Sequence, residues 1–142
     1  MQDIFNPNEM ITIRNFVFNE LEVNGIIVYD ATSECVIVDP GCNSLKQCAL
    51  LKEFVSEHLL KPVFIINTHG HFDHIFGNAW CKETYKCPLL AHLHDLPIIE
   101  QADKFAGVFG FEIDRSPTPD RYLMHGETLV FGNARLEILH VP

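Results

Sequence analysis

The residues best suited to chemistry lie in one short stretch, Thr68-His69-Gly70-His71-Phe72-Asp73-His74. Imidazole nitrogens and a carboxylate oxygen are ligands that borderline cations such as Zn²⁺, Fe²⁺ or Mn²⁺ accept. His69 and His71 are separated by one residue, so in an extended segment their side chains point the same way and can grip one ion. Asp73 and His74 follow where the chain turns into a helix and can face a second ion. Two such ions would polarise a carbonyl and hold a hydroxide between them.

The segments just before these residues predict how they are positioned. Residues 63–67 form an apolar, β-branched and aromatic run, which predicts a strand buried on both faces. The candidate ligands therefore occupy the loop that leaves this strand. A second run, residues 35–38, ends in Asp39-Pro40-Gly41, whose proline and glycine favour a turn. Asp39 is thus expected at the end of another strand.

The first half of the chain has the pattern of strands followed by a helix. Residues 11–18, 26–29 and 35–38 predict a β-meander. A helix is predicted from Ser44, capped by that residue or by Asn43 and closed at Lys61-Pro62, because a residue before proline avoids helical geometry. Strand, helix and strand then predict a right-handed βαβ unit with parallel strands. The predicted apolar face of the helix consists of Leu45, Cys48, Leu51, Val55 and Leu59.

The second half predicts shorter elements. We expect a helix within residues 75–86, a buried strand at 87–91 and a surface loop at 107–120 that faces substrate. Gly132-Asn133 suits a tight turn between two final strands, residues 128–131 and 135–141. A further helix is expected after Pro97, with Asp95 or His94 as its cap and with Ile98, Ala102 and Phe105 on one face.

Composition predicts one soluble domain spanning residues 1–142. The chain is 47% hydrophobic and 20% charged, and its sequence has no apolar segment long enough to span a bilayer. A formal net charge of −9 excludes an electrostatic footprint for nucleic acid. The start has no secretory signal pattern, so we expect a cytoplasmic protein. The five cysteines lack a C-x-x-C pair, and Cys81 and Cys87 are expected to be buried and unreactive.

A second H-x-H pattern, His92 and His94, is less suggestive of a metal site. No Asp-His pair follows it, and Asp95 is better explained as a helix cap, so the pattern favours a structural role. His58 and His125 are interpreted as surface groups.

The motifs resemble those of a known family. Residues 68–74 match the H-x-H-x-D-H signature of the metallo-β-lactamase superfamily, and Val38-Asp39-Pro40-Gly41 matches its upstream aspartate turn. Residues 29–41 and 68–77 are most similar to the hydroxyacylglutathione hydrolase, or glyoxalase II, branch. The resemblance implies an α+β fold, an αββα sandwich of which this chain supplies about the N-terminal half as a mixed β-sheet with helices on one face.

The resemblance also implies roles for individual residues. His69 and His71 would ligate a first metal, Asp73 and His74 a second, and Asp39 would support the site. Asp73 would additionally orient the nucleophile. The expected cofactor is a divalent metal, Zn²⁺ first and Fe or Mn as alternatives, with two sites in the full domain.

The implied function is a hydrolase whose metal-bound hydroxide attacks a thioester or ester carbonyl, with an acylglutathione-like small molecule as substrate. His71 stands where the flavodiiron branch carries a glutamate, which favours hydrolysis over reduction of oxygen or nitric oxide. Two alternatives stay open. One is a mononuclear-iron persulfide dioxygenase, which shares the same signature. The other is a catalytically inactive metal-binding fragment.

The last residues differ from the family pattern. In the family, the strand that matches residues 136–142 continues into Gly-His, and that histidine is the third ligand of the first metal. His140 is expected inside the strand and is not its substitute. We therefore expect an N-terminal portion whose exposed apolar sheet face is covered by the C-terminal half or by another copy of the chain.

Overall fold

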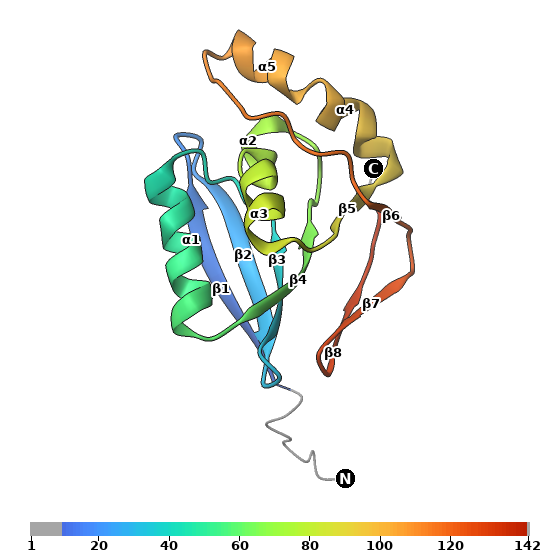
Figure 1. The fold of residues 1–142 in the computed structure, drawn as a ribbon. Helices are drawn as coiled ribbons and strands as arrows, with labels where there is room; N and C mark the ends of the chain where they lie inside the picture. The colour runs from blue at the N-terminus through green and yellow to red at the C-terminus, as the bar shows by residue number, and fades with distance from the viewer. Residues whose placement is uncertain (1–9, 142) are drawn as a thin grey trace.

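The computed structural model describes residues 10–141, which form a six-stranded sheet and a separate two-stranded hairpin (Figure 1). The strand order of the large sheet is β1-β2-β3-β4-β5-β6, and β7 pairs with β8. The strands are β1 Ile11–Phe18, β2 Val23–Asp30, β3 Glu34–Val38, β4 Lys61–Ile66, β5 Leu89–His92, β6 Arg121–Leu123, β7 Thr128–Phe131 and β8 Ala134–Glu137.

The sheet is mixed, as the sequence predicts. β1, β2 and β3 are antiparallel neighbours, which confirms the meander. β3 and β4 are parallel and joined by a helix, which confirms the βαβ unit. β5 and β6 continue the parallel part. The helical segments are α1 Leu45–Glu57, α2 Phe72–Ile75, α3 Asn78–Tyr85, a 3₁₀ turn at Leu93–Asp95, α4 Leu96–Glu100 and α5 Ala102–Val108.

The helix α1 is shorter at its C-terminus than the sequence predicts. Ser44 caps its start, where its Oγ accepts a hydrogen bond from the Gln47 N–H at 3.2 Å. The helix ends at Glu57, and Leu59 adopts a left-handed conformation with a φ of 52°. Leu45 and Leu59 are 86% and 82% exposed, so their predicted place on the buried face was wrong. Pro62 lies inside β4, opposite a register shift in β3, where a missing N–H is tolerated.

Alternating residues of the central strands build two apolar layers. On one face, Cys35 and Ile37 of β3 pack with Cys48 and Leu51 of α1. On the other face, Val36 packs in a cluster that includes β7 and β8. Figure 1 accordingly shows α1 and α3 on one side of the sheet and the hairpin apart from them. This arrangement confirms the expected α+β fold, a mixed sheet with helices on one face.

A third apolar cluster lies beneath the loop that carries the candidate ligands. Ile75, Ala91, Ile99 and Ala102 are buried together, and Phe72 packs against them. These residues come from α2, β5, α4 and α5, so the loop rests on four separate elements.

Several later elements differ from the predicted ones. The helix expected within residues 75–86 is confirmed as α3, which starts later, at Asn78, and a separate short helix, α2, precedes it. β6 was not predicted, because its three residues are recognised only through their pairing with β5. The final hairpin turn is confirmed, but β8 ends at Glu137, so His140 lies outside the strand.

The apolar face that the sequence leaves open is covered only in part. Leu129 and Phe131 of the hairpin are buried against the sheet. Ile11, Ile13 and Val17 on the edge strand β1 are 41%, 63% and 62% exposed. Within residues 10–141, no helix combines the length and the hydrophobicity needed to cross a membrane.

Candidate metal centre

The pairing of β3 with β4 positions the candidate site. Val38 lies opposite Ile66 in the parallel register, so the residues that follow the two strands emerge side by side. Asp39 follows β3 directly, and its backbone N–H donates to the carbonyl of Ile66 at 2.9 Å. Thr68 begins the ligand loop after β4. The two sequence motifs, 29 residues apart, therefore meet at one edge of the sheet.

Asp39 is a buried residue whose carboxylate hydrogen-bonds to the ligand loop at this edge of the sheet. It is 5% exposed and adopts a φ of 50°, an uncommon conformation for a residue other than glycine. One carboxylate oxygen accepts the backbone N–H of Thr68 at 2.8 Å. The other accepts the Thr68 hydroxyl and, at 3.2 Å, Nδ1–H of His74. Because a carboxylate accepts hydrogen bonds here, His74 carries a proton on Nδ1, and its Nε2 is the atom free to bind a metal.

The three histidines of the loop gather around His69. The centroids of the His69 and His74 rings are 4.0 Å apart, and those of His69 and His71 are 4.8 Å apart. His74 Nε2 lies 3.8 Å from a carboxylate oxygen of Asp73. One ligand atom from each of Asp39, His69 and His74 falls within 4.8 Å of the other two. The group of ligand atoms close enough for one ion thus consists of Asp39, His69 and His74, while His71 and Asp73 are neighbours of this group and not members of it.

The electrostatics favour a site ready for a cation. Partial burial, followed by the neighbouring His74, lowers the pKa of His69, which keeps its imidazole neutral and able to ligate. The hydrogen bond to Asp39 raises the pKa of His74. A bound cation would replace a proton at His74 Nε2, so ion binding at this residue competes with protonation.

Asn19 is a positioning residue that the sequence reading missed. It lies in the turn between β1 and β2 with a φ of 53°. Its side-chain amide donates to the carbonyl of Gly41 at 2.9 Å and to that of Asp73 at 3.0 Å. A Cβ on Gly41 would lie 2.6 Å from the Asp73 carbonyl oxygen, so the turn after Asp39 and the ligand loop touch directly. An asparagine in a turn gives no sequence signal for this role.

A buried pair of amides fixes the other end of the loop. Asn67 and Asn78 are 2% and 0% exposed and exchange two side-chain hydrogen bonds of 3.0 and 2.8 Å. Asn78 also donates to the Ser116 hydroxyl at 2.9 Å. The end of β4, the start of α3 and the loop after α5 are therefore locked together.

Asp95 has a different role from the predicted one. Asp95 precedes α4, but its side chain makes no capping hydrogen bond. Its carboxylate accepts the backbone N–H of Gly70 at 3.3 Å instead. A Cβ on Gly70 would lie 2.7 Å from the Ile99 side chain, so this glycine is required for the close approach of α4 to the ligand loop.

An apolar cavity of about 420 Å³ opens beside the candidate ligands. His71 and Asp73 form its polar wall. Its apolar wall includes Ile98, Ala102 and Phe105, the three residues that the sequence placed on one helix face. The remaining lining residues are Leu21, Phe72 and Phe109.

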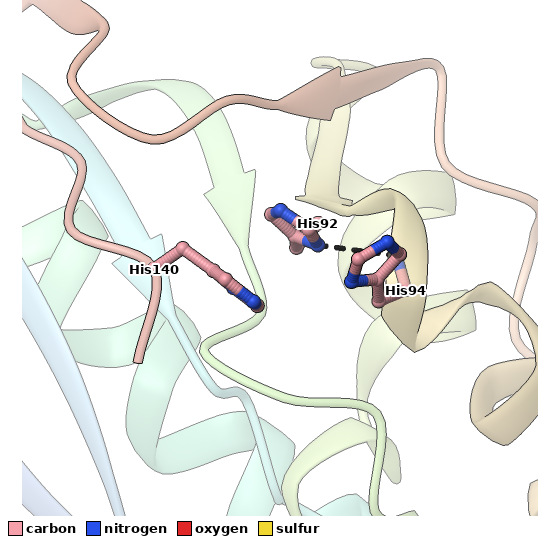
Figure 2. Close-up of side chains that lie close together, drawn as sticks. All are labelled: His92, His94 and His140. Carbon is pink, nitrogen blue, oxygen red and sulfur yellow. Dashed lines mark hydrogen bonds between the residues drawn. The ribbon is translucent and has the colours of Figure 1, made fainter. Parts of the chain in front are cut away.

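The other candidate residues lie elsewhere. His58 is exposed at the end of α1 and stacks on Phe54 with 4.0 Å between centroids. His125 is exposed and its Nδ1 accepts the backbone N–H of His140 at 3.0 Å. The cysteines of the chain are all buried and free, and burial raises the pKa of Cys35 to about 12. His92 and His94 lie together with His140 (Figure 2).

The sequence of this chain matches a known protein family. The family model described as the metallo-beta-lactamase superfamily matches residues 19–142. The chain belongs to the metallo-beta-lactamase superfamily. An uncharacterised protein of Aquifex aeolicus is 30% identical over 125 residues, which are 86% of this chain and 56% of that protein. A hydroxyacylglutathione hydrolase of Pelagibacter ubique is 24% identical over 117 residues, covering 82% of this chain and 40% of that protein. The chain thus spans about half the length of these superfamily relatives.

Solved structures agree with the family. A B3 metallo-beta-lactamase matches with a TM-score of 0.80 at 24% identity, covering 92% of this chain and 62% of that chain. A protein crystallised in a di-iron-bound form matches with a TM-score of 0.73 at 31% identity, covering 82% of this chain and 56% of that chain. The superfamily fold therefore extends over the large sheet and the ligand loop.

The residues at the edge of the sheet fit a divalent cation. The donor set is three imidazoles and one carboxylate, with a second carboxylate hydrogen-bonded to one imidazole. Such nitrogen and oxygen sets suit zinc, iron and manganese, and the carboxylate behind His74 is the usual way of orienting a metal-binding histidine.

Proposed function

We propose that this protein is a metal-dependent hydrolase that cleaves a thioester or ester of a small molecule, with an acylglutathione-like compound as substrate. The observation that carries the proposal is the anchoring of His74 and Thr68 by the buried carboxylate of Asp39, which holds the ligand loop around one point. The similarity to a hydroxyacylglutathione hydrolase supports the choice of substrate class.

The proposed roles are those that the resemblance to the superfamily implies. His69 and His71 would hold a first divalent ion, and Asp73 and His74 would hold a second in the complete domain. Zn²⁺ is the expected ion, and when bound it would polarise the substrate carbonyl and make water more acidic. Asp73 accepts a hydrogen bond from the attacking water and aims it at the carbonyl carbon. Asp39 keeps the proton of His74 on Nδ1, so that Nε2 faces the site.

The apolar cavity suggests where the acyl group lies. Its polar wall contains His71 and Asp73, and its apolar wall contains Phe105 and Ile98. An acyl chain in this space places its carbonyl next to the ligand loop and leaves the thiol carrier outside. Burial of the apolar chain would supply binding energy remote from the reacting atoms.

The proposal is tested with two variants in the ligand loop. His71→Ala and Asp73→Ala are expected to lower hydrolysis of an acylglutathione thioester by about 100-fold or more, because each removes a ligand or the group that orients water. Metal content of the purified protein should fall in parallel. His58→Ala removes an exposed histidine on α1 and is the matched control, with unchanged turnover and metal content.

Other outcomes would contradict the proposal. Unchanged turnover in both variants would remove the ligand loop from the reaction. Oxygen consumption with glutathione persulfide, together with one iron per chain, would assign the protein to the persulfide dioxygenases. A folded protein that binds less than one tight ion and hydrolyses no thioester would be the inactive metal-binding fragment.

A further inference from the structure

A second histidine cluster lies outside the ligand loop. His92 ends β5, His94 lies in the 3₁₀ turn that follows, and His140 comes from the segment after β8. One ring nitrogen from each residue falls within 4.8 Å of the other two. Figure 2 shows His140 reaching from the C-terminal segment toward His92 and His94. This arrangement brings together residues 46 positions apart in the sequence.

We propose that His92, His94 and His140 form a separate binding site for a transition-metal ion of the Zn²⁺, Ni²⁺ or Cu²⁺ type. Three neutral imidazoles are a sufficient ligand set for these ions, and they leave a fourth position for water or another small ligand. Its ligands are different residues from those of the ligand loop, and the proposal does not depend on the proposed hydrolase activity.

The three rings lie close enough to reach one ion once the side chains rotate. His92 and His140 are nearly parallel, with 3.9 Å between centroids and 13° between planes. His94 approaches them at 69° and 76°, so its lone pair comes from a different direction. In a zinc site the ligand atoms lie about 3.3 Å apart and each imidazole binds in its ring plane, so His140 must rotate out of its stack on His92. His140 is only partly buried and His94 is exposed, which leaves room for this rotation.

The protonation state of the cluster also suits a metal. Desolvation, followed by the neighbouring His140 and His94, lowers the pKa of His92, which favours the neutral form that binds metals. His92 Nδ1 accepts the backbone N–H of His94 at 3.1 Å. In a neutral imidazole the accepting nitrogen is also the one with the free lone pair. Ion binding at His92 therefore replaces this hydrogen bond and releases the His94 N–H.

The backbone around His140 supports its position. The His140 N–H donates to His125 Nδ1 at 3.0 Å, and Ile138 exchanges two backbone hydrogen bonds with Gly126 and Glu127. An ion in the cluster would tie this C-terminal segment to the end of β5. Because the ion binds only the folded arrangement, it should raise the melting temperature.

The experiment measures Zn²⁺ binding by equilibrium dialysis. In the double variant His69→Ala/His74→Ala, the ligand loop is disabled and one Zn²⁺ per chain is expected to remain. Adding His94→Ala to that variant should weaken the remaining binding at least tenfold and remove the zinc-induced rise in melting temperature. His94 is exposed, so its truncation leaves no internal cavity. His58→Ala is the matched control and should leave binding unchanged.

A second measurement covers the case in which the double variant does not fold. In the otherwise unaltered chain, His94→Ala or His140→Ala should each lower the number of bound Zn²⁺ ions by one relative to His58→Ala. The amide resonance of His94 should shift on addition of Zn²⁺, as its hydrogen bond to His92 is lost. Equal zinc stoichiometry in all three variants, with no shift of this resonance, would overturn the proposal. Loss of zinc from the ligand loop alone would leave the second site intact, so the two proposals fail separately.

Discussion

At the scale of single residues, Asp39 determines the geometry of the candidate metal centre. Its carboxylate holds Thr68 and His74, and its own backbone adopts a φ of 50°. Asn19 also adopts a positive φ and holds the carbonyls of Gly41 and Asp73. Uncommon backbone conformations of this kind persist only where surrounding hydrogen bonds determine them, and they concentrate at functional sites.

The role of Asp39 is tested by Asp39→Asn. Asparagine tolerates a positive φ, so the turn is retained, while the charge that orients His74 is lost. Zn²⁺ affinity of the ligand loop should fall by about 10-fold to 100-fold, as when a carboxylate behind a metal-binding histidine is removed. Competition with a chromophoric chelator measures this change.

Asp30→Asn is the matched control for this substitution. Asp30 is also a buried aspartate, 5% exposed, but it accepts the backbone N–H groups of Thr32 and Asn133 at the hairpin. This control should change stability and leave metal affinity intact. An equal loss of affinity in the two variants would mean that Asp39 acts only through the fold.

At the scale of elements, the sequence predicts most successfully the strands, turns and loops that depend on a local pattern of residues. The meander, the βαβ unit and the hairpin turn follow from short runs of residues, and the ligand loop follows from its spacing. Leu45 and Leu59 were wrongly assigned to the buried face of the helix, because the sequence alone does not distinguish an exposed leucine from a buried one.

Features formed by residues far apart in the sequence could not be predicted from local sequence patterns. β6 is defined by its pairing with β5, and Asn19 acts across 54 residues on Asp73. The triad of His92, His94 and His140 exists only once β8 ends at Glu137 and the chain turns back toward β5.

The charged side chain of Asp120 connects three elements of the fold. Its carboxylate accepts the backbone N–H of Leu89 at 2.8 Å and pairs with Lys82, so it links the start of β6 with β5 and α3. The hydrogen bond from Leu89, followed by that from Lys82, lowers the pKa of Asp120 below its ordinary value of 3.8. The ionised carboxylate therefore stabilises the fold above that value, and the contribution is lost as the pH falls through the lowered pKa.

Asp120→Ala tests this linkage. The free energy of unfolding at pH 7 should fall by about 1 kcal/mol, a modest value because the side chains of the ion pair are partly exposed. The difference from the unaltered protein should shrink as the pH falls below 3.8. Urea unfolding at several pH values measures it, with the exposed Asp114 changed to alanine as control. A difference independent of pH would exclude the charge as the cause.

At the scale of the whole molecule, the chain gathers its candidate ligands at one edge of a mixed sheet. The large sheet carries helices on one face, and the hairpin covers part of the other. Ile13 and Val17 remain more than 60% exposed on the edge strand β1. We expect this surface to be covered in the functional protein by a second copy or by the part of the domain that the relatives carry beyond the matched region.

The central claim is the proposal that divalent ions held by the ligand loop, at His69 and His71 and at Asp73 and His74, support thioester hydrolysis. Its most direct test is removal of the metal by a chelator, followed by graded return of Zn²⁺ while hydrolysis of an acylglutathione is recorded. Turnover should disappear in the metal-free protein and return in proportion to the zinc bound at the ligand loop. Turnover that persists in the metal-free protein would contradict the account.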